Sequence, residues 1–422
     1  MTMYRRLLTQ PLTDALADSP VVLVNGARQT GKTTLVQSFA AQRPASYFTL
    51  DDIGVLSAAR SDPQGFLAGL SGPVVLDEVQ HAPGLFPALK AAVDKQRTPG
   101  RFLLTGSANV LLLPKLSESL AGRMEVLTLW PLAQAELVPA ERAGAIGNLV
   151  DALFSDSLFA ERMPVGQDLP ATEPADLVRR LLGGGYPEPL ARSSPERRRA
   201  WFNSYLTTIL QRDVRDIANI EGLTDLPRLL ALLASRTSSL LNQADVSRAS
   251  GLPYTTLLRY LALLEATFLV QMLPPWSSNL GQRLVKAPKV TLCDTGLAAS
   301  LLGLDGERLA GDGAMRGQLL ETFVTMEMRK QAGWSRTQPG LFHWRTAAQQ
   351  EVDLLLEDAS GRLVGIEVKA SGTATASDFK GLRALAQATG SRFLRGVVLY
   401  AGGQTIPFGE RLHAMPLSAL WN

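Results

Sequence analysis

The sequence predicts an α/β protein whose N-terminal part is a parallel sheet covered by helices. Short apolar runs that end in polar or acidic residues alternate with helical patterns in this part of the chain. The run at 21–24 leads into a glycine-rich loop and a helical pattern, and the run at 74–76 ends in two acids. Strand, loop and helix in this order are typical of a parallel α/β sheet. A helical middle region and a second, C-terminal α/β part follow.

Length and composition indicate a globular protein of several domains. With 422 residues, of which 46% are hydrophobic and 19% charged, the chain has enough apolar residues for about two to four cores. Its single cysteine, Cys293, excludes a disulfide framework and indicates a reducing, cytoplasmic compartment. The three histidines lie far apart in the sequence, which excludes a histidine-rich zinc site.

Neither a targeting segment nor a membrane segment is expected. The first 20 residues lack the long apolar core of a signal peptide, and no uncharged run approaches the length of a membrane span. We expect these residues to form a short amphipathic helix with Tyr4, Leu7 and Leu8 against the first domain. The net charge of +3 does not by itself indicate nucleic acid, so a nucleic-acid surface would have to come from local basic clusters.

The loop after the first strand has the form G-x-x-x-x-G-K-[ST] and lies between a strand and a helix, as a phosphate-binding loop requires. Its glycines let backbone N–H groups and the helix N-terminus point at one anion. A chance match is disfavoured because both flanks are correct. We therefore expect ATP to bind at Gly26, Ala27, Arg28, Gln29, Thr30, Gly31, Lys32, Thr33 and Thr34.

Two further strands supply the other groups that phosphate chemistry needs. Asp77 and Glu78 follow three apolar residues, so Asp77 is expected to hold Mg²⁺ through water, together with Thr33, and Glu78 to polarise the attacking water. The strand at 101–107 ends in polar residues at the same sheet edge, so Thr105 or Ser107 is expected to sense the γ-phosphate. An ordinary turn is the alternative for that segment.

Arg123 lies in a loop before another predicted strand. It is a candidate arginine finger that would reach the ATP of a neighbouring subunit. A surface salt bridge is the alternative, because a single arginine in a loop is weak support for such a role.

The middle of the chain divides into a helical linker at 137–176 and a helical region at 177–300. A turn is expected at Gly183–Pro187, followed by an arginine-rich amphipathic helix that carries Arg212 and Arg215. These arginines are candidates for contacts with a nucleic-acid backbone, and a solvated helix face is the alternative.

Residues 228–276 have the pattern of a winged helix. Asn242 is expected to cap a second helix, and a third helix at 254–266 has Leu257, Leu258, Leu261 and Leu264 facing inward. Its outward residues near the start are the candidates for DNA contact: Thr255, Thr256 and Arg259. The alternative is a winged helix that serves only in packing.

A hairpin near the C-terminus brings a second set of charged residues together. Folding it about Ser360 puts Asp353 opposite Glu367, with Cβ atoms about 5 Å apart. Lys369 lies two residues further along the strand and faces the same way. Two carboxylates that hold a metal ion, with a lysine beside them, suit a Mg²⁺-dependent phosphodiesterase, and Glu321 could complete the set. A surface salt bridge is the alternative.

With these residues in view, nearly the whole chain resembles a prokaryotic family of AAA-type ATPases. In that family a P-loop domain precedes a winged-helix region and a C-terminal domain of the PD-(D/E)XK nuclease fold. The motifs that carry the resemblance are GARQTGKTT, VVLDEVQ, RFLLTGSAN, SLAGR, GGGYPEP, KAPKVTLCDTGLA, EVDLLLE and IEVKAS. One departure is Val352, where the nuclease signature commonly has proline before its aspartate.

The resemblance implies a five-stranded sheet in which the 101–107 strand lies between the P-loop strand and the strand that ends at Asp77. It also implies a ring, expected to be hexameric, because AAA-type sites form between subunits. The expected domains are an ATPase domain at 1–136, the linker at 137–176, the winged-helix region at 177–300 and the nuclease-like domain at 301–422.

Three functions are compatible with this organisation. The favoured one is an ATP-driven DNA motor, similar in organisation to the Holliday-junction branch-migration motors and acting on branched DNA. The second is an ATP-regulated, Mg²⁺-dependent endonuclease in repair or defence. The third is a signalling ATPase that binds protein partners.

Overall fold

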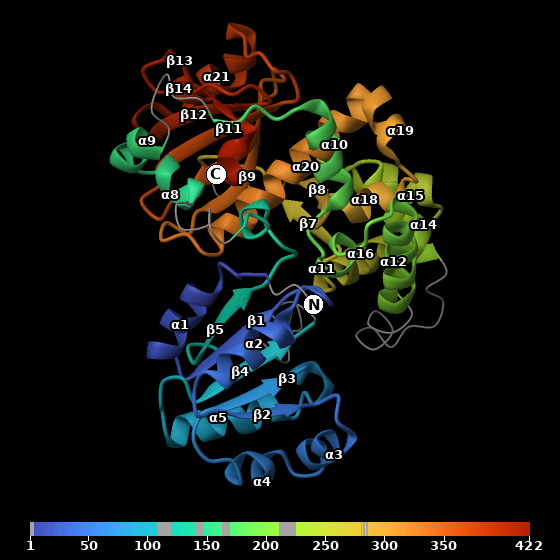
Figure 1. Ribbon diagram of the computed structural model, residues 1–422, viewed down its shortest axis with the longest axis vertical. Helices are drawn as coiled ribbons and strands as arrows, with labels where there is room; N and C mark the ends of the chain where they lie inside the picture. The colour runs from blue at the N-terminus through green and yellow to red at the C-terminus, as the bar shows by residue number, and fades with distance from the viewer. Residues whose placement is uncertain are drawn as a thin grey trace. The chain divides into compact units, whose positions relative to one another are not determined.

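The computed structural model describes residues 4–107, 120–139, 147–162, 169–210, 225–279, 281, 283 and 286–422. The chain forms two compact units (Figure 1). The smaller consists of Arg6–Pro131 and Ala262–Leu269, and the larger contains the remaining described residues. Among the described residues, no helix has both the length and the apolar character that crossing a membrane requires.

The smaller unit is built on a five-stranded parallel sheet, as predicted. The strand after Arg101 pairs on one side with the P-loop strand and on the other with the strand that ends at Asp77, which confirms the expected insertion. The strands, in order across the sheet, are β2 (Ser46–Thr49), β3 (Val74–Asp77), β4 (Phe102–Gly106), β1 (Val21–Asn25) and β5 (Met124–Thr128).

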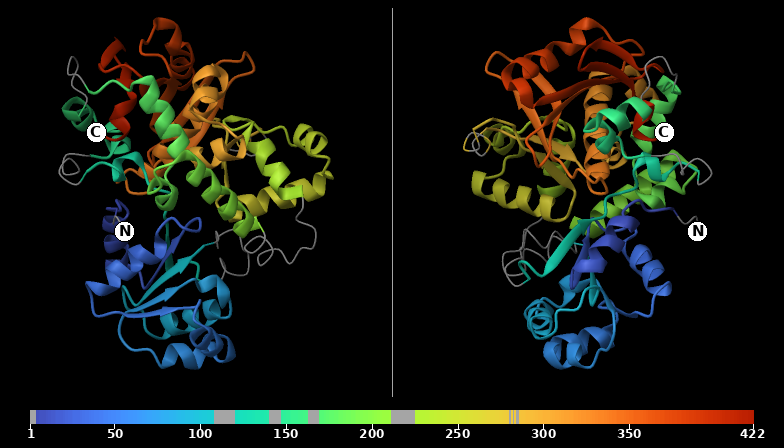
Figure 2. Two further views of the ribbon diagram at one scale, coloured as in Figure 1. Left: turned by 45° about the vertical axis from the view of Figure 1, so that its right-hand side comes forward. Right: turned by 90° about the vertical axis from the view of Figure 1, so that its left-hand side faces the viewer.

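Helices cover both faces of this sheet (Figure 2). Alternate residues of β1 explain why: Val21 and Leu23 belong to one apolar core, and Val22 and Val24 belong to the other. Burial of each such side chain contributes about 1.5–3 kcal/mol. The first core is completed by α3 (Ile53–Ser61), α4 (Pro63–Ala68) and α5 (Leu85–Lys95), and the second by α1 (Thr9–Asp18) and α2 (Lys32–Ala41).

The N-terminal helix begins later than its sequence pattern predicts. It starts at Thr9, so Tyr4, Leu7 and Leu8 precede it. Leu8 is buried as expected, while Tyr4 and Leu7 are half-buried. The apolar face of the helix itself consists of Leu12, Ala15 and Leu16.

The first part of the larger unit is helical. The predicted turn at Gly183–Pro187 joins α10 to α11, and Tyr186 in this turn is fully buried with aromatic residues of α12, among them Trp201 and Tyr205. The helices are α8 (Leu149–Leu153), α9 (Asp156–Arg162), α10 (Pro174–Gly183), α11 (Pro187–Leu190) and α12 (Pro195–Thr208).

Three helices and three short strands follow, counting only elements whose bounds the described residues give. Asn242 caps α15, as predicted, by accepting a hydrogen bond from the Asp245 N–H. The antiparallel sheet has the order β6-β8-β7, so its last strand in the chain lies in the middle. The elements are α14 (Leu226–Ala234), β6 (Ser239–Leu240), α15 (Gln243–Ser250), α16 (Tyr254–Ala266), β7 (Val270–Leu273) and β8 (Lys289–Leu292).

One inward residue of α16 was predicted wrongly. Leu257, Leu261 and Leu264 are buried, but Leu258 is 38% exposed. Buried residues at spacings of three and four define one face of a helix, and a residue adjacent in sequence is turned by about 100° from it.

The C-terminal part is a mixed six-stranded sheet of order β13-β14-β12-β11-β10-β9. Its hairpin has the predicted register: Leu354 pairs with Ile366 and Leu356 with Val364. The elements are α18 (Thr295–Leu301), α19 (Gly306–Gly311), α20 (Gly313–Ala332), β9 (Gly340–Arg345), β10 (Glu351–Glu357), β11 (Leu363–Lys369), α21 (Lys380–Thr389), β12 (Phe393–Tyr400), β13 (Ile406–Gly409) and β14 (Leu412–Pro416).

Candidate functional site

The loop between β1 and α2 has the backbone shape of a phosphate-binding loop. Gly26 and Gly31 have positive φ angles of 146° and 94°, and Gln29 has φ 60°. A Cβ atom at Gly26 would lie 2.2 Å from the Leu129 carbonyl oxygen, so only glycine fits there. Gly31 immediately precedes α2, which leaves the N-terminal amides of that helix directed at the loop.

Lys32 is held against this loop. Its Nζ donates to the carbonyl oxygens of Gly26 at 3.0 Å and Ala27 at 2.9 Å, and the residue is only 4% exposed. Thr30 donates its hydroxyl to the same Ala27 oxygen at 3.0 Å. The ammonium is thus fixed within the curl of the loop, where a lysine can contact the β- and γ-phosphates of a bound nucleotide.

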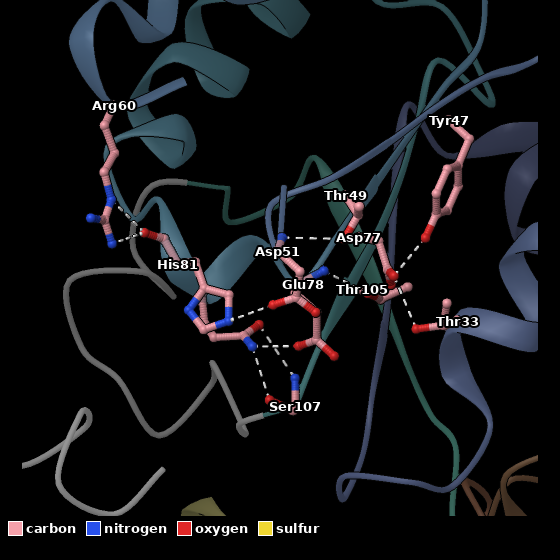
Figure 3. Close-up of polar contacts among 11 residues, drawn as sticks. Thr33, Tyr47, Thr49, Asp51, Arg60, Asp77, Glu78, His81, Thr105 and Ser107 are labelled. Atoms are coloured by element: carbon pink, nitrogen blue, oxygen red, sulfur yellow. Dashed lines mark hydrogen bonds and ion pairs between the residues drawn. The ribbon is translucent and has the colours of Figure 1, made fainter. Parts of the chain in front are cut away.

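The carboxylate of Asp77 joins three different elements (Figure 3). Thr33 from α2 donates its hydroxyl to Oδ2 at 2.9 Å, and Tyr47 from β2 donates to the same oxygen at 2.8 Å. Thr105 from β4 donates to Oδ1. Thr33 and Asp77, the two residues predicted to hold Mg²⁺, are therefore adjacent, and their oxygen atoms are the ligands that this ion prefers.

Tyr47 is a site residue that the sequence analysis did not single out. Burial, together with its hydrogen bond to Asp77 and the charge of that carboxylate, raises the pKa of Tyr47 to about 12. The phenol therefore keeps its proton and remains a donor to Asp77. Tyr47 lies on β2, the strand next to β3, and this adjacency arises only in the folded sheet.

Glu78 follows Asp77 in an unusual backbone conformation, with φ 60°. Its N–H donates to the Thr105 hydroxyl at 2.9 Å. Burial alone would raise the pKa of Glu78, but the charges of Lys32 and Arg28 and the hydrogen bonds from Gln80 and Ser107 lower it below its ordinary value. The carboxylate is therefore ionised at neutral pH and can act as a base.

Gln80 positions Glu78 and is a second residue that the sequence analysis missed. Its Nε2 donates both to Glu78 Oε2 and to Ser107 Oγ, the latter at 2.9 Å. The turn that carries Gln80, η1 (Val79–His81), is fixed by Arg60, which donates to the His81 carbonyl oxygen at 2.9 and 2.7 Å. Ser107 thus lies beside Glu78, and its role as a γ-phosphate sensor stays a prediction.

Arg123 forms the salt bridge that was the alternative to an arginine finger. Its Nε and Nη2 atoms donate to the two carboxylate oxygens of Asp94, on α5, at 2.5 and 3.0 Å. This pairing lowers the pKa of Asp94 and raises that of Arg123. A role for Arg123 in a neighbouring subunit stays a prediction.

The C-terminal residues predicted to act together do lie together. Asp353 Oδ2 accepts the Val368 N–H at 3.0 Å, and Lys369 Nζ lies 3.8 Å from Glu367 Oε2. Burial and the Asp353 carboxylate raise the pKa of Glu367 to about 10 and that of Glu321 to about 8. We call Glu321, Asp353 and Glu367 the acidic cluster.

An additional cation lies in the acidic cluster. Lys289 Nζ is 2.6 Å from Glu321 Oε1 and 3.8 Å from Asp353 Oδ1. Within the described ranges, no group of three or more histidine, cysteine, aspartate or glutamate residues is arranged to hold a metal ion. Lys289 thus supplies an ammonium next to two of the three carboxylates, and the assignment of a metal to Asp353 and Glu367 stays a prediction.

The candidates for DNA contact divide into two groups. On α16, Thr255 and Arg259 are exposed, as predicted, while Thr256 is half-buried. Arg212 and Arg215 lie outside the described residues.

Comparison with known proteins is consistent with this geometry. Residues 18–138 match the AAA domain family, and residues 174–308 and 316–420 match two domains of unknown function, DUF8612 and DUF4143. Uncharacterized protein Rv2008c of Mycobacterium tuberculosis is 32% identical over 417 residues, which cover 99% of this chain and 84% of that protein. Uncharacterized protein Mb2031c of Mycobacterium bovis matches to the same extent.

This chain belongs to the family of these mycobacterial proteins. It is an AAA-type P-loop ATPase, and such a domain binds a nucleotide, typically with Mg²⁺. Among solved structures, the Walker-type ATPase PABY2304 of Pyrococcus abyssi is similar at 15% identity and a TM-score of 0.41, over 69% of this chain and 94% of that one. The RuvB Holliday junction branch migration motor of Thermotoga maritima is similar at 17% identity and a TM-score of 0.27, over 63% and 89%. Neither similarity carries an argument about function.

The ion pair between Arg123 and Asp94 leads to a direct test. Because Asp94 engages two guanidinium nitrogens, we expect Arg123→Ala and Asp94→Ala each to change the ATPase rate by no more than about twofold, as for a surface salt bridge. The measurement is steady-state phosphate release at saturating ATP. A loss of about a thousandfold in Arg123→Ala but not in Asp94→Ala would instead identify an arginine finger.

Proposed function

We propose that this protein hydrolyses ATP at Asp77 and Glu78 and uses the hydrolysis cycle to move along or remodel DNA, with branched DNA as the preferred substrate. The observation that carries the hydrolysis step is the position of the Glu78 carboxylate, which directly follows Asp77 and accepts a hydrogen bond from Gln80. The charge of Lys32 helps to lower its pKa. A binding module without turnover would not need a half-buried, oriented base at this position.

Each residue of the site has a distinct task in this proposal. Lys32 binds the β- and γ-phosphates, and Glu78 accepts the proton of the attacking water. Thr33 and Asp77 would hold Mg²⁺, which when bound neutralises charge on the phosphate oxygens. Since the pKa of Glu78 is lowered, the base is present across the neutral range and is lost only in acid, as the carboxylate becomes protonated.

Gln80 could couple contact of the γ-phosphate at Ser107 to the orientation of Glu78. It binds the base Glu78 and the strand-end residue Ser107 with the same amide nitrogen. A γ-phosphate that contacts Ser107 would compete for these hydrogen bonds and so change the orientation of Glu78. The orientation of the base Glu78 would then depend on whether a triphosphate is bound.

The DNA part of the proposal rests on the middle of the chain. The order α14, β6, α15, α16, β7, β8, with β6 and β7 both paired to β8, supports the interpretation of this region as a winged helix. In such a domain the third helix enters the major groove and its first residues reach the bases. Thr255 and Arg259 are exposed in that part of α16, next to Tyr254, which is 49% exposed.

Assembly into a homo-oligomeric ring is part of the proposal and rests on the AAA family alone. The endonuclease alternative keeps its carboxylates and Lys369, but Lys289 in the acidic cluster weighs against it. The signalling alternative draws on the exposed apolar side chains of Tyr254 and Leu258, which would equally suit a protein partner.

Substitution of Glu78 tests hydrolysis. Glu78→Gln retains the shape of the side chain but removes the base, so we expect ATP binding to persist while turnover falls by about a hundredfold or more. Lys32→Ala is the matched control, because it should lose ATP binding as well. Binding is followed with a fluorescent ATP analogue and turnover by phosphate release. Wild-type turnover in Glu78→Gln would contradict the assignment.

Substitution of Arg259 tests DNA binding by α16. If Arg259 contacts a phosphate, Arg259→Ala should weaken binding similarly for all sequences and lower the slope of log affinity against log salt by about one. Arg308→Ala, on α19, removes the same charge elsewhere on the larger unit and should have no effect. Fluorescence anisotropy with linear, forked and four-way DNA measures the affinity and its salt dependence for each variant. Failure of the wild-type chain to bind any of these at low salt would favour the signalling alternative.

A further inference from the structure

We infer that Lys289 is the resident cation of the acidic cluster and that it closes this cluster to divalent metal ions. The inference concerns the C-terminal domain and does not depend on the ATPase. It assigns a role to the Lys289 side chain of the KAPKVTLCDTGLA motif, a side chain that neither the proposed ATP site nor the proposed DNA contacts use.

The first step is the position of the lysine. Lys289 is the first residue of β8, and its ammonium lies beside the carboxylates of Glu321 on α20 and Asp353 on β10. Nζ lies 2.6 Å from Glu321 Oε1 and 3.8 Å from Asp353 Oδ1, and the side chain is only 7% exposed. Oxygen ligands of Mg²⁺ lie about 2.1 Å from the metal, so a metal ion on Glu321 and this ammonium would exclude each other.

The second step is that the backbone before Lys289 is held in place. His343 of β9 bonds through Nε2 to the Ala287 carbonyl oxygen at 3.2 Å, and the Leu241 N–H donates to the Pro288 oxygen at 2.8 Å. Since a carbonyl oxygen only accepts, His343 Nε2 carries the proton. The His343 backbone is paired in turn with Pro274 and Trp276. Lys289 therefore enters the cluster from an anchored strand.

The third step is charge. Glu367 is buried and Glu321 and Asp353 are half-buried, so negative charge on this cluster is poorly solvated and is stabilised by positive charge nearby. Lys369 Nζ lies 3.8 Å from Glu367 Oε2, and its side chain is 37% exposed. The nearly buried Lys289 instead pairs with Glu321 and Asp353. Without Lys289, the acidic cluster would keep only the partly exposed Lys369, and a divalent cation would then supply the missing positive charge.

The experiment is a titration of the full-length, nucleotide-free protein with Mn²⁺, followed by calorimetry and by thermal unfolding. We expect Lys289→Met to bind one additional Mn²⁺ at least about a hundredfold more tightly than the wild-type cluster, since an ammonium 2.6 Å from Glu321 Oε1 and 3.8 Å from Asp353 Oδ1 has been removed. The added ion should also raise the melting temperature of the variant. Asp353→Asn in the Lys289→Met background should abolish the gain.

Two controls keep the result interpretable. Lys286→Met removes an exposed lysine from the same segment and should behave as wild type. Metal binding at Thr33 and Asp77 is common to all variants and cancels in the comparison. Should Lys289→Met unfold, the variant Lys289→Met/Glu321→Gln removes both members of the ion pair and should still bind Mn²⁺ more tightly than wild type.

Two results would overturn the inference. One is a wild-type chain that binds a Mn²⁺ ion which Asp353→Asn removes, because the metal would then displace Lys289 unaided. The other is a folded Lys289 variant, single or double, whose affinity for Mn²⁺ equals that of the wild-type chain.

Discussion

The carboxylate of Asp77 is the group on which the rest of the nucleotide site depends. It accepts hydroxyl hydrogen bonds from Thr33, Tyr47 and Thr105, which belong to α2, β2 and β4. These bonds tie the helix after the phosphate loop to the two strands that flank β3. The Thr105 hydroxyl also accepts a hydrogen bond from the Glu78 N–H, so the same network positions the base. The sheet order β2-β3-β4-β1 is what makes this arrangement possible.

Much of this site could be predicted from sequence because its signals are local. The loop glycines, Lys32, Thr33 and the acids after β3 lie at fixed spacings within continuous segments, and parallel strands bring their ends to one sheet edge. Tyr47 and Gln80 were missed for a physical reason. Their roles depend on which strand lies beside β3 and on the φ of 60° at Glu78, and neither is encoded by a spacing.

In the C-terminal domain, too, some features could be predicted from the sequence and others could not. Hairpin geometry alone gave the register that brings Asp353 and Glu367 together, because cross-strand pairing follows from the turn. Lys289 could not be found by that reasoning. The helices α18 and α19 separate it from Glu321 in the sequence, and the two side chains come into contact only in the folded chain. Leu258 is a smaller case: an apolar residue in a leucine-rich helix was assigned to the core by its type, yet its angular position leaves it exposed.

The central claim is that Asp77 organises a hydrolytic ATP site, and the most direct test is the Mg²⁺ dependence of phosphate release by Asp77→Asn. The substitution keeps the shape of the side chain but removes its charge. The account predicts that the variant needs at least about tenfold more Mg²⁺ than wild type for half-maximal turnover, or fails to turn over. Asp51→Asn, at an exposed acid after β2, should match wild type. An unchanged Mg²⁺ dependence in Asp77→Asn would contradict the account.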